Sequence, residues 1–550
     1  MSYQNLAELH RRQADRLGPR PALRYRRDGI WHDVSWADYR EQVAACAAAL
    51  VDVGVQPGDR VGLLAENRVE WLIADLGLLA AGAVCVPPHA PLTARQVHFQ
   101  LACTETVWVF VSTQEQLAKV LQVRAELPSL RGIVLFDRAE HAYAVAWPTF
   151  LQRGRAAWPR FGRELARREA ALGQDDLATI MYTSGTTGDP KGVMLSHGNL
   201  LSNAVAAVQC LGQAEDGLLL TWLPLSHIYA RLCDHYASIA AGNTIALAPS
   251  ADCVVESLDE LRPTQMSAVP RFYEKLLAAV ASSDVAETGR RLREAFGPRV
   301  RMLSSGGAPL PRAVLDAYLA AGITLRPGYG LTESSPIISF NSVDRFKPGT
   351  VGPALPGVEV RIAADGEILT RGPHVMKGYW KNPRATAEAI RDGWLHTGDL
   401  GEIDADGFLT ITGRKKELLV LSSGKKVVPS QIEGLLLADP CIDQVIVCGE
   451  GRHYLTALVV PNWDNLRRAG VDVDHAPLEE RCERSDVIAA LRERIDAALA
   501  YLAGWEQIKH FAVLRQPFSA AADELTVSLK LRRTVILERN RERIGALYQS

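Results

Sequence analysis

The stretch at residues 182–192, which reads YTSGTTGDPKG, has the clearest potential for chemistry. An apolar run, LATIM, leads into it, so a buried strand is expected to end where this loop begins. Its glycines expose backbone N–H groups, its hydroxyls donate hydrogen bonds and Lys191 adds a positive charge, a combination that suits a polyphosphate. It is not a Walker A loop, because Pro190 precedes the lysine and neither serine nor threonine follows it. A generic glycine-rich loop would be equally well explained as a flexible Gly/Thr linker, but these eleven residues together disfavour that interpretation.

Five further motifs follow this loop: SSGGAPL at 304–310, GYGLTESSP at 328–336, LHTGDL at 395–400, GRKKELLVLSSGKKVVP at 413–429 and LTVSLKLRR at 525–533. In this order the six segments resemble the adenylate-forming superfamily, which includes acyl-CoA synthetases, peptide-synthetase adenylation domains and luciferases. The resemblance covers the chain from about Asp176 to its end. It implies that a carboxylate attacks the α-phosphate of ATP, so that an acyl-adenylate forms and pyrophosphate leaves.

The resemblance assigns the phosphate and metal contacts to hydroxyl, ammonium and carboxylate groups. Thr332 would donate to the α-phosphate, and Glu333 is a hard oxygen ligand that suits Mg²⁺, with Thr186 as a second metal contact. Outside this context, a lone glutamate in a loop is ordinary solvated surface. The expected catalytic residues are Lys191, Thr332, Glu333 and Lys530.

The nucleoside contacts are assigned in the same way. Tyr329 offers a flat face for adenine, and the side-chain-free edge at Gly306 and Gly307 faces the other side of the base. Asp399 supplies acceptors for the ribose hydroxyls, and Arg414 donates to the same sugar, although an isolated TGD segment would be read only as an Asp turn. The expected ATP and AMP contacts are Thr183, Ser184, Gly185, Thr186, Thr187, Gly188, Lys191, Gly306, Gly307, Ala308, Tyr329, Gly330, Thr332, Asp399 and Arg414.

Lys530 is the expected catalytic lysine. Adenylation concentrates negative charge around the α-phosphate, and one ammonium group can contact both that phosphate and the attacking carboxylate. The usual motif has Thr-Gly directly before this lysine, whereas Ser528 and Leu529 stand there in this chain. That departure resembles the long-chain fatty acyl-CoA synthetase variant. Without the other motifs, a lysine beside Arg532 and Arg533 would be read as part of a solvated helix face.

Residues 413–429 are expected to join two domains, with Lys416, by resemblance, as the hinge. Rotation at the hinge separates two incompatible tasks, because Lys530 must enter for adenylation and then leave to admit a thiol. Gly424 would line the thiol tunnel, and Lys425 and Lys426 would contact the phosphates of coenzyme A. A solvated turn is an equally good interpretation of this lysine pair.

The acyl substrate is inferred from LPLSHIYAR at 223–231 and VPRFYEKL at 269–276, which resemble the long-chain branch more than the acetate or aromatic-acid branches. His227 and Arg231 are expected at the acyl entrance and Ile337 in the tunnel lining. Core packing is the competing interpretation of His227 and Ile337. The chain shows no insertion of the kind that marks fatty acyl-AMP ligases.

The elements that must position these motifs follow from hydrophobic patterns. Four apolar runs, VGLLA, AVCVP, VWVFV and GIVLF, predict buried parallel strands with helical crossovers such as residues 71–80, which is a doubly wound α/β sheet. Residues 357–369 alternate polar and apolar side chains and predict a small β subdomain. We therefore expect an N-terminal adenylation domain over residues 1–415 and a small mobile α+β domain over residues 416–550. The latter should have strands at 444–448 and 454–460 and helices near 486–500 and 531–545.

Composition excludes several classes. A chain of 550 residues is too long for one core, and a formal net charge of -2 from 61 basic and 63 acidic residues gives no overall field for nucleic acid or an anionic bilayer. The N-terminus lacks the apolar core of a signal peptide, and the apolar stretch at 71–86 is too short to span a bilayer. Nine cysteines without a CxxC pair fit a reducing cytoplasm. A peripheral membrane contact and a homodimer are left open.

The sequence therefore predicts a two-domain AMP-forming ligase that converts a fatty acid, ATP and coenzyme A to acyl-CoA, AMP and pyrophosphate, with Mg²⁺. The alternatives are a fatty acyl-AMP ligase that loads an acyl carrier protein, a medium-chain or aromatic acyl-CoA synthetase, and a non-catalytic nucleotide or acyl sensor. The sensor is disfavoured because the whole set of reactive residues is present, namely Lys191, Glu333, Asp399, Arg414 and Lys530.

Overall fold

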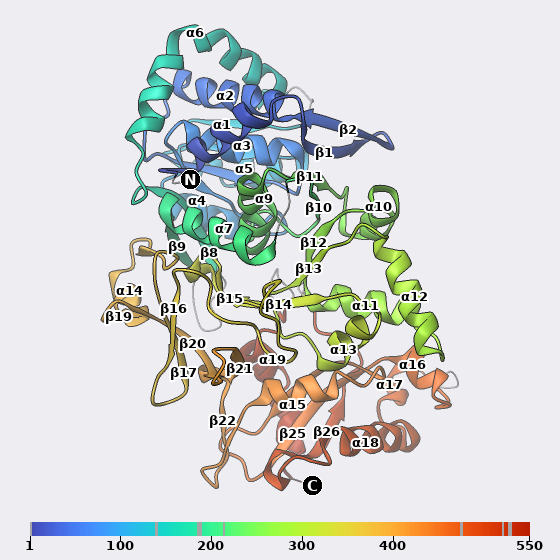
Figure 1. The fold of residues 1–550 in the computed structure, drawn as a ribbon. Coiled ribbons are helices and arrows are strands. Elements are labelled where there is room, and N and C mark those ends of the chain that lie inside the picture. Colours follow the sequence, from blue (N-terminus) through green and yellow to red (C-terminus); the bar gives the residue numbers. More distant parts are fainter. Residues whose placement is uncertain are drawn as a thin grey trace.

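Two eight-stranded sheets form the larger part of the computed structural model, which describes residues 3–137, 141–183, 190–212, 215–473, 477–519, 522–525 and 531–549 (Figure 1). The first sheet has the order β18-β9-β8-β4-β3-β5-β6-β7. Its strands are β3 (Arg60–Leu64), β4 (Val84–Val86), β5 (Trp108–Val111), β6 (Gly132–Leu135), β7 (Val145–Ala146), β8 (Leu177–Thr183), β9 (Lys191–Ser196) and β18 (Gly378–Tyr379). Strands β3 to β8 are parallel, and β9 and β18 extend one edge in antiparallel fashion. The four predicted parallel strands are confirmed as β3, β4, β5 and β6.

Helices cover both faces of this sheet. Helices α2 (Trp36–Asp52), α3 (Val69–Ala80) and α6 (Trp147–Ala171) share one hydrophobic core with Leu63 of β3. Helices α4 (Ala94–Cys103) and α5 (Gln114–Gln122) share another with Leu64. Neighbouring residues of one strand enter different cores because side chains alternate across a strand. The doubly wound arrangement predicted from the sequence is therefore confirmed.

The second large sheet has the order β15-β14-β13-β12-β10-β11-β1-β2. Its strands are β1 (Pro21–Arg27), β2 (Ile30–Ser35), β10 (Leu218–Thr221), β11 (Thr244–Leu247), β12 (Gln265–Ala268), β13 (Met302–Ser305), β14 (Leu325–Gly330) and β15 (Ile337–Phe340). The six central strands are parallel, whereas β2 and β15 pair antiparallel at the edges. Ser305 and Gly330 end two neighbouring parallel strands. The SSGGAPL and GYGLTES segments therefore emerge from the same edge of one sheet.

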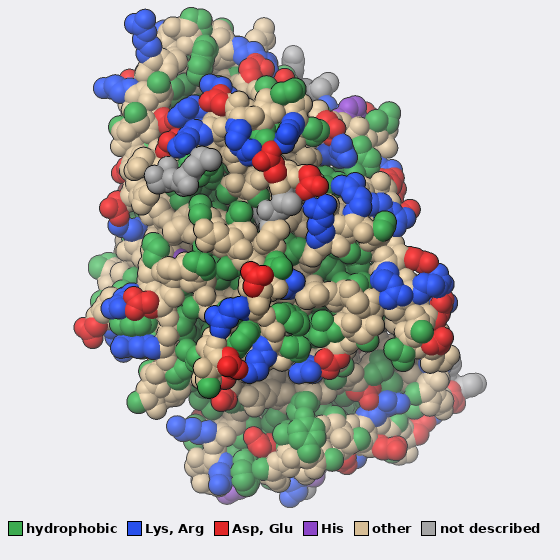
Figure 2. All heavy atoms as spheres, viewed as in Figure 1, with side chains coloured by type: hydrophobic (Ala, Val, Ile, Leu, Met, Phe, Trp, Pro, Cys, Tyr) green, Lys and Arg blue, Asp and Glu red, His purple; other side chains and the backbone are tan. Residues whose placement is uncertain are grey.

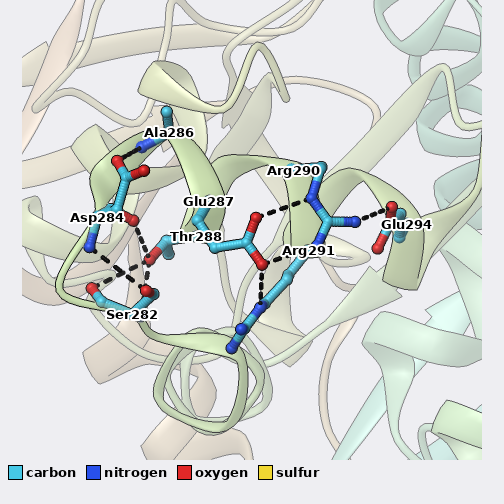
Figure 3. A network of polar contacts seen from close by, with 8 residues as sticks. All are labelled: Ser282, Asp284, Ala286, Glu287, Thr288, Arg290, Arg291 and Glu294. Carbon is cyan, nitrogen blue, oxygen red and sulfur yellow. Dashed lines mark hydrogen bonds and ion pairs between the residues drawn. The ribbon is translucent and has the colours of Figure 1, made fainter.

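Helices also cover this second sheet. Helix α7 (His197–Leu211), which is capped by Ser196, packs on one side, while α10 (Val254–Leu261), α11 (Pro270–Val280), α12 (Val285–Phe296) and α13 (Arg312–Ala320) pack on the other. A polar network fixes the exposed side of α12 (Figure 3). Asp284 caps the helix by accepting from the N–H of Ala286, and Glu287 is paired with Arg290 and Arg291. Glu287 therefore neutralises part of the basic charge on this helix.

A five-stranded antiparallel sheet follows the second large sheet and appears at the left of Figure 1. Its strands are β16 (Glu359–Ile362), β17 (Glu367–Arg371), β19 (Ile390–Arg391), β20 (Trp394–Ile403) and β21 (Leu409–Arg414). Strand β20 contains the LHTGDL segment, and β21 ends at Arg414. This is the small β subdomain that the alternation at residues 357–369 predicted.

The last part of the chain has hydrophobic cores of its own. Strands β22 (Leu419–Val420) and β23 (Lys426–Val427) form a small hairpin, and β24 (Ile442–Cys448), β25 (Leu455–Pro461) and β26 (Ile508–Val513) form a three-stranded sheet. Its helices include α15 (Pro429–Leu436), α18 (Ser485–Leu499), α19 (Arg533–Arg539) and α20 (Arg541–Ala546). Both predicted strands and the helix near 486–500 are present, while the predicted helix near 531–545 is divided into α19 and α20.

The surface matches the balanced composition. On the face drawn in Figure 2, acidic and basic side chains are interspersed. Among the helices of the described ranges, none combines the length and the apolar character needed to cross a bilayer.

Candidate active site

Three of the predicted nucleotide contacts meet at Asp399. Its Oδ2 accepts a hydrogen bond from the hydroxyl of Tyr329 at 2.7 Å, and its Oδ1 accepts one from Nε of Arg414, also at 2.7 Å. Asp399 and Arg414 are directly opposite each other in the β20–β21 register, which brings the two motifs together. Asp399 is buried, and the side chain of Arg414 remains 42% exposed.

The surroundings keep Arg414 charged and the Tyr329 hydroxyl protonated. Burial disfavours the charged guanidinium of Arg414, but the nearby carboxylate of Asp399 outweighs burial and raises the pKa of Arg414. Burial, reinforced by Asp399, raises the pKa of the Tyr329 hydroxyl well above its ordinary value, so this group stays a donor. Each carboxylate oxygen has a second lone pair and can accept a further hydrogen bond. The cluster therefore presents an aromatic ring and a fixed anion suited to the hydroxyls of a sugar.

A second cluster surrounds Glu333, which lies in the short 3₁₀ turn Thr332–Ser334. The hydroxyl of Tyr379 donates to Oε1 of Glu333 at 2.9 Å, and the backbone N–H of Met376 donates to the Glu333 carbonyl at 2.9 Å. Nζ of Lys191 lies 5.0 Å from the centroid of the Tyr379 ring, within the range of a cation–π interaction. Tyr379 thus contacts two of the predicted catalytic residues.

Magnesium suits this second cluster. Within the described parts of the chain, no three His, Cys, Asp or Glu side chains gather as a metal site. Mg²⁺ is commonly bound by one or two carboxylates together with substrate phosphates, so a full protein cage is not required. The half-buried carboxylate of Glu333 supplies such a ligand beside the ammonium of Lys191.

The edge predicted to face adenine lies directly after β13. Gly306 is buried, and a Cβ there would lie 3.1 Å from the ring of Tyr229. Gly307 has φ +83, a conformation that favours glycine, and Gly307 and Ala308 are exposed. The hydroxyl of Tyr229 is 2.9 Å from Oγ of Ser304, which ties the aromatic ring to the end of the strand. The predicted side-chain-free edge is therefore present, with Gly307 exposed and Gly306 covered by the ring of Tyr229.

Gly330 is required by a close backbone approach. A Cβ at this residue would lie 1.8 Å from the carbonyl oxygen of Pro336. That same oxygen accepts the N–H of Leu331 at 3.0 Å and the hydroxyl of Ser334 at 2.5 Å. The turn that carries Thr332 and Glu333 is thereby folded back onto β15.

Several predicted residues lie outside the described ranges. These are Ser184, Gly185, Thr186, Thr187 and Gly188 of the glycine-rich loop and the tail lysine, Lys530. The two ends of the loop are described: Thr183 ends β8, Lys191 begins β9, and the two residues are paired in register. The two ends of the loop therefore lie side by side on the first sheet.

The hinge and coenzyme A candidates lie on exposed turns. Lys416 is exposed in the 3₁₀ turn Lys415–Glu417, while its neighbour Lys415 pairs with Asp365 at 2.5 Å and Glu367 at 3.0 Å. Gly424 and Lys425 are exposed in the turn between β22 and β23, and Lys426 is exposed as the first residue of β23. Nζ of Lys425 lies 4.4 Å from the centroid of the Trp505 ring.

The expectation that Arg231 stands at the acyl entrance is wrong. Arg231 and Asp75 are both fully buried, and Nη2 of Arg231 pairs with Oδ1 of Asp75 at 2.5 Å. The guanidinium also donates to Thr179 at 2.7 Å and to the hydroxyl of Tyr236 at 3.0 Å. Burial opposes ionisation of Asp75, but Arg231 outweighs it and lowers the pKa of that carboxyl. Arg231 is therefore held in the core by its own counterion.

The other two acyl candidates are placed differently. His227 is half-buried, accepts the N–H of Tyr229 on Nδ1 at 3.2 Å and has its ring stacked 6.3 Å from that of His89. Ile337 begins β15 and packs in the largest hydrophobic core with 8% exposure. His227 thus contacts Tyr229 and His89, whereas Ile337 contributes to packing.

Sequence reasoning missed Tyr379 and Tyr229. Tyr379 reaches Glu333 because β18 pairs with β9, a contact between segments far apart in the chain. Its only local signal is the Gly-Tyr pair in MKGYW, which is common in turns. Tyr229 lies inside the LPLSHIYAR segment, two residues after His227, which is one of the predicted acyl-binding residues.

Comparison with known proteins matches both parts of the chain. A family model described as AMP-binding enzyme matches residues 10–380, and one described as AMP-binding enzyme C-terminal domain matches residues 416–550. The chain is 35% identical to the long-chain-fatty-acid–CoA ligase FadD15 of Mycobacterium bovis, over 95% of this chain and 93% of that protein. It is also similar to the solved structure of ATP-bound MatB from Rhodopseudomonas palustris, with 27% identity, a TM-score of 0.75, and coverage of 98% of this chain and 99% of that one. The anthranilate CoA ligase AuaEII in complex with anthranoyl-AMP has the same fold, with a TM-score of 0.81 at 21% identity over 99% of this chain and 98% of that one.

Proposed function

The chain belongs to the AMP-binding enzyme family, and from this membership we propose that it is an AMP-forming ligase that joins a long-chain fatty acid to coenzyme A. In the first half-reaction the fatty acid carboxylate attacks the α-phosphate of ATP, and pyrophosphate leaves. In the second half-reaction the thiol of coenzyme A attacks the acyl carbon, and AMP leaves. The 35% identity to a long-chain-fatty-acid–CoA ligase over 95% of the chain supports the choice of substrate.

The observation that carries the proposal is the meeting of Tyr329, Asp399 and Arg414 in one hydrogen-bonded cluster. An aromatic face and a fixed anion suit a nucleoside, whose base stacks and whose ribose hydroxyls donate. Thr332 and Glu333 follow Tyr329 by a few residues, so the triphosphate would extend from the ribose toward Glu333 and Lys191. Thr332 would then donate to the α-phosphate, where the carboxylate attacks.

Magnesium would be held by Glu333 together with phosphate oxygens, and Thr186 is the second ligand proposed from the motif. When bound, the ion neutralises charge on the phosphates and helps orient them. Tyr379 holds Oε1 of Glu333 by a hydrogen bond and lies beside Lys191. It thereby positions the carboxylate and the ammonium relative to each other.

We place the second half-reaction in a mobile C-terminal domain at residues 416–550, with the N-terminal domain at residues 1–415. Lys415 is exposed but forms ion pairs with Asp365 and Glu367, which hold it to the N-terminal domain. The chain beyond these ion pairs begins at Lys416, where we place the rotation. Rotation there would remove Lys530, which serves adenylation, from the active site and bring in the β22–β23 hairpin with Gly424, Lys425 and Lys426. That hairpin would contact coenzyme A.

The proposed function is tested by measuring pyrophosphate release with a panel of carboxylic acids. Burying one methylene contributes about 0.8 kcal/mol, so the eight additional methylenes of a C16 acid over a C8 acid contribute up to roughly 6 kcal/mol in a long tunnel. Imperfect burial and ordering of the tail reduce this gain. We expect kcat/KM to rise steeply from C8 to C14 or C16, with acids kept below their micelle-forming concentrations.

Two other outcomes would redirect the proposal. A preference for acetate or an aromatic acid over palmitate would remove the long-chain substrate and leave adenylation intact. Transfer of the acyl group to an acyl carrier protein but not to coenzyme A would make the chain a fatty acyl-AMP ligase. Absence of carboxylate-dependent pyrophosphate release would refute enzymatic activity altogether.

A further inference from the structure

A pocket lies at the opposite end of the strands that carry the nucleotide motifs. It has a volume of about 170 Å³ and is lined by Leu211, Thr264, Gln265, Met302, Arg326 and Val343, among others. Gln265 and Met302 are the first residues of β12 and β13, and Arg326 is the second residue of β14. The nucleotide motifs leave the other ends of β13 and β14. We call this cavity the rear pocket.

Two buried donors on residues that line the rear pocket have no acceptor among the residues that the structure describes. Nε2 of Gln265 and Nε of Arg326 lack a hydrogen-bond partner, and the two residues are only 4% and 8% exposed. The majority of buried polar groups are satisfied, so two such donors on residues that line one cavity call for a bound partner. That partner must present acceptor atoms.

The charge at the rear pocket is also uncompensated. No carboxylate in the described part of the chain lies within ion-pair distance of Arg326. Its Nη1 donates to the backbone carbonyl of Ser342, and its guanidinium carbon is 5.8 Å from the centroid of the Phe346 ring. Burial lowers the pKa of Arg326, and the exposed Asp344 offsets only part of that effect.

The remaining charged groups do not remove this excess. Arg301 also lines the pocket, and its carboxylate partner Asp216 is engaged by both Nη atoms at 3.0 and 3.2 Å. A buried cation is costly unless it is paired, and a guanidinium fits the oxygens of carboxylates and phosphates. The rear pocket thus combines a buried cation, two free donors and a cavity.

We propose that the rear pocket binds a small oxyanion, a phosphate or carboxylate group, whose oxygens accept from the guanidinium of Arg326 and the side-chain amide of Gln265. On this measure a cavity needs only about 10–15 Å³ to hold one water, so about 170 Å³ has room for a small oxyanion. Orthophosphate has five non-hydrogen atoms. The site is separate from the nucleotide clusters and does not depend on the proposed acyl-CoA reaction.

The experiment uses the full chain with its nucleotide site filled by a non-hydrolysable ATP analogue, so that phosphate cannot be counted at the triphosphate position. Sodium phosphate and sodium acetate are titrated separately by calorimetry, with ionic strength held constant by chloride. We expect saturable binding at one site for at least one anion. Binding of phosphate alone, or of acetate alone, identifies which oxyanion the site takes.

Two variants and a control assign the binding to this pocket. Arg326→Met should weaken anion binding at least tenfold, and Gln265→Leu should weaken it several-fold. Arg299→Met is the matched control, because Arg299 is an exposed arginine near Arg301 that does not line the cavity. This variant should bind the anion with the same affinity as the unaltered chain. If Arg326→Met does not fold, Arg326→Lys keeps the charge but lacks Nε and should still weaken binding.

The proposal fails if neither anion binds the unaltered chain, which would leave water as the occupant of the pocket. It also fails if Arg299→Met weakens binding as much as Arg326→Met, because the effect would then come from general surface charge. Neither result bears on adenylation, which is followed independently by pyrophosphate release.

Discussion

The hydroxyl of Tyr329 donates a hydrogen bond of 2.7 Å to Asp399, a residue 70 positions further along the chain. Arg414 donates to the other oxygen of the same carboxylate. The surface proposed for adenine and the acceptor proposed for ribose are therefore parts of one unit. A change in the central carboxylate should affect both.

Asp399→Asn should lower kcat/KM for ATP by about 10- to 100-fold. The substitution keeps the shape of the side chain but removes its charge, and hydrogen bonds to charged groups are worth about 1.5–3 kcal/mol. Tyr329→Phe, which removes only the hydroxyl, should lower it by about 2- to 10-fold, since a typical net hydrogen bond is worth about 0.5–1.5 kcal/mol. ATP-dependent pyrophosphate release measures both, and unchanged kinetics in Asp399→Asn would contradict the ribose assignment.

Tyr379→Phe should raise KM for MgATP by about 2- to 10-fold, because the phenyl ring stays beside Lys191 while the hydrogen bond to Glu333 is lost. Tyr379→Leu should have a larger effect, since it also removes a cation–π contact of about 0.5–1 kcal/mol. Initial rates at varied MgATP concentrations give KM. Mn²⁺ affinity is measured separately in the presence of an ATP analogue, with Glu333→Gln as the reference variant that lacks the metal-binding carboxylate. Equal effects of the two Tyr379 variants would show that the ring does not act on Lys191.

Lys530→Ala should slow adenylation by about 10² to 10³, the typical loss when one preorganised charge donor is removed. Thioester formation from supplied acyl-AMP should be nearly unchanged, because that step requires the lysine to have left the site. The two half-reactions are measured separately by pyrophosphate release and by acyl-CoA formation. A comparable loss in both would show that Lys530 has a structural role.

Lys416→Pro should leave adenylation largely intact and slow transfer to coenzyme A. Proline fixes φ at one position and so restricts rotation of the backbone there. Lys416→Ala is the matched control, since it removes the same side chain without restricting the backbone. Normal transfer kinetics in Lys416→Pro would remove the hinge assignment.

His10 should make the protein less stable in acid. It lies in α1 (Leu6–Leu17) with its ring 4.5 Å from that of Tyr39, and burial, aided by His235 and Arg40, lowers the pKa of His10 to about 3. An unfolded histidine has a pKa of about 6.5, so below that pH the unfolded chain binds a proton that the folded chain excludes. The contribution of neutral His10 is therefore present in full above pH 6.5 and is lost as the pH falls toward 3.

The expected loss is about 1.4 kcal/mol per pH unit, or about 2 kcal/mol at pH 5. Burial also lowers the pKa of His89, His197 and His374 to about 4, so the unaltered chain should show a steeper combined dependence. His10→Phe keeps a ring in place and removes one titrating group. Urea unfolding midpoints at pH 7.5 and 5.0 should therefore differ less in this variant, and an equal difference would contradict the assignment.

Local patterns were sufficient for the strands but not for the contacts between motifs. The run WVFV is apolar at every position, so β5 was predictable as a buried strand from four consecutive residues. The pairing of Asp399 with Arg414 depends on the register of β20 and β21, which shifts at Leu400 and Gly401. The contact of Tyr379 with Glu333 depends on strand pairing between distant segments. Neither relationship leaves a periodic signal in the sequence.

Arg231 shows why a single basic residue is ambiguous. In the sequence it stands alone among apolar neighbours, as a receptor for a carboxylate would. Its counterion, Asp75, is likewise a lone acid within the apolar stretch at 71–86, and 156 residues separate the two. Each residue is unusual by itself, but only the folded chain shows that they neutralise each other.

The contact between Gly330 and Pro336 has an evolutionary consequence. Because a Cβ at Gly330 would lie 1.8 Å from a backbone oxygen, even alanine would force the two strands apart. Every replacement of Gly330 adds at least one carbon to the side chain, so no substitution at this position is neutral. The neighbouring Leu331 contributes its backbone N–H to the turn, which any residue other than proline supplies, and its side chain is only partly buried. In diverging copies of this gene, we therefore expect substitutions to accumulate at Leu331 while Gly330 stays unchanged.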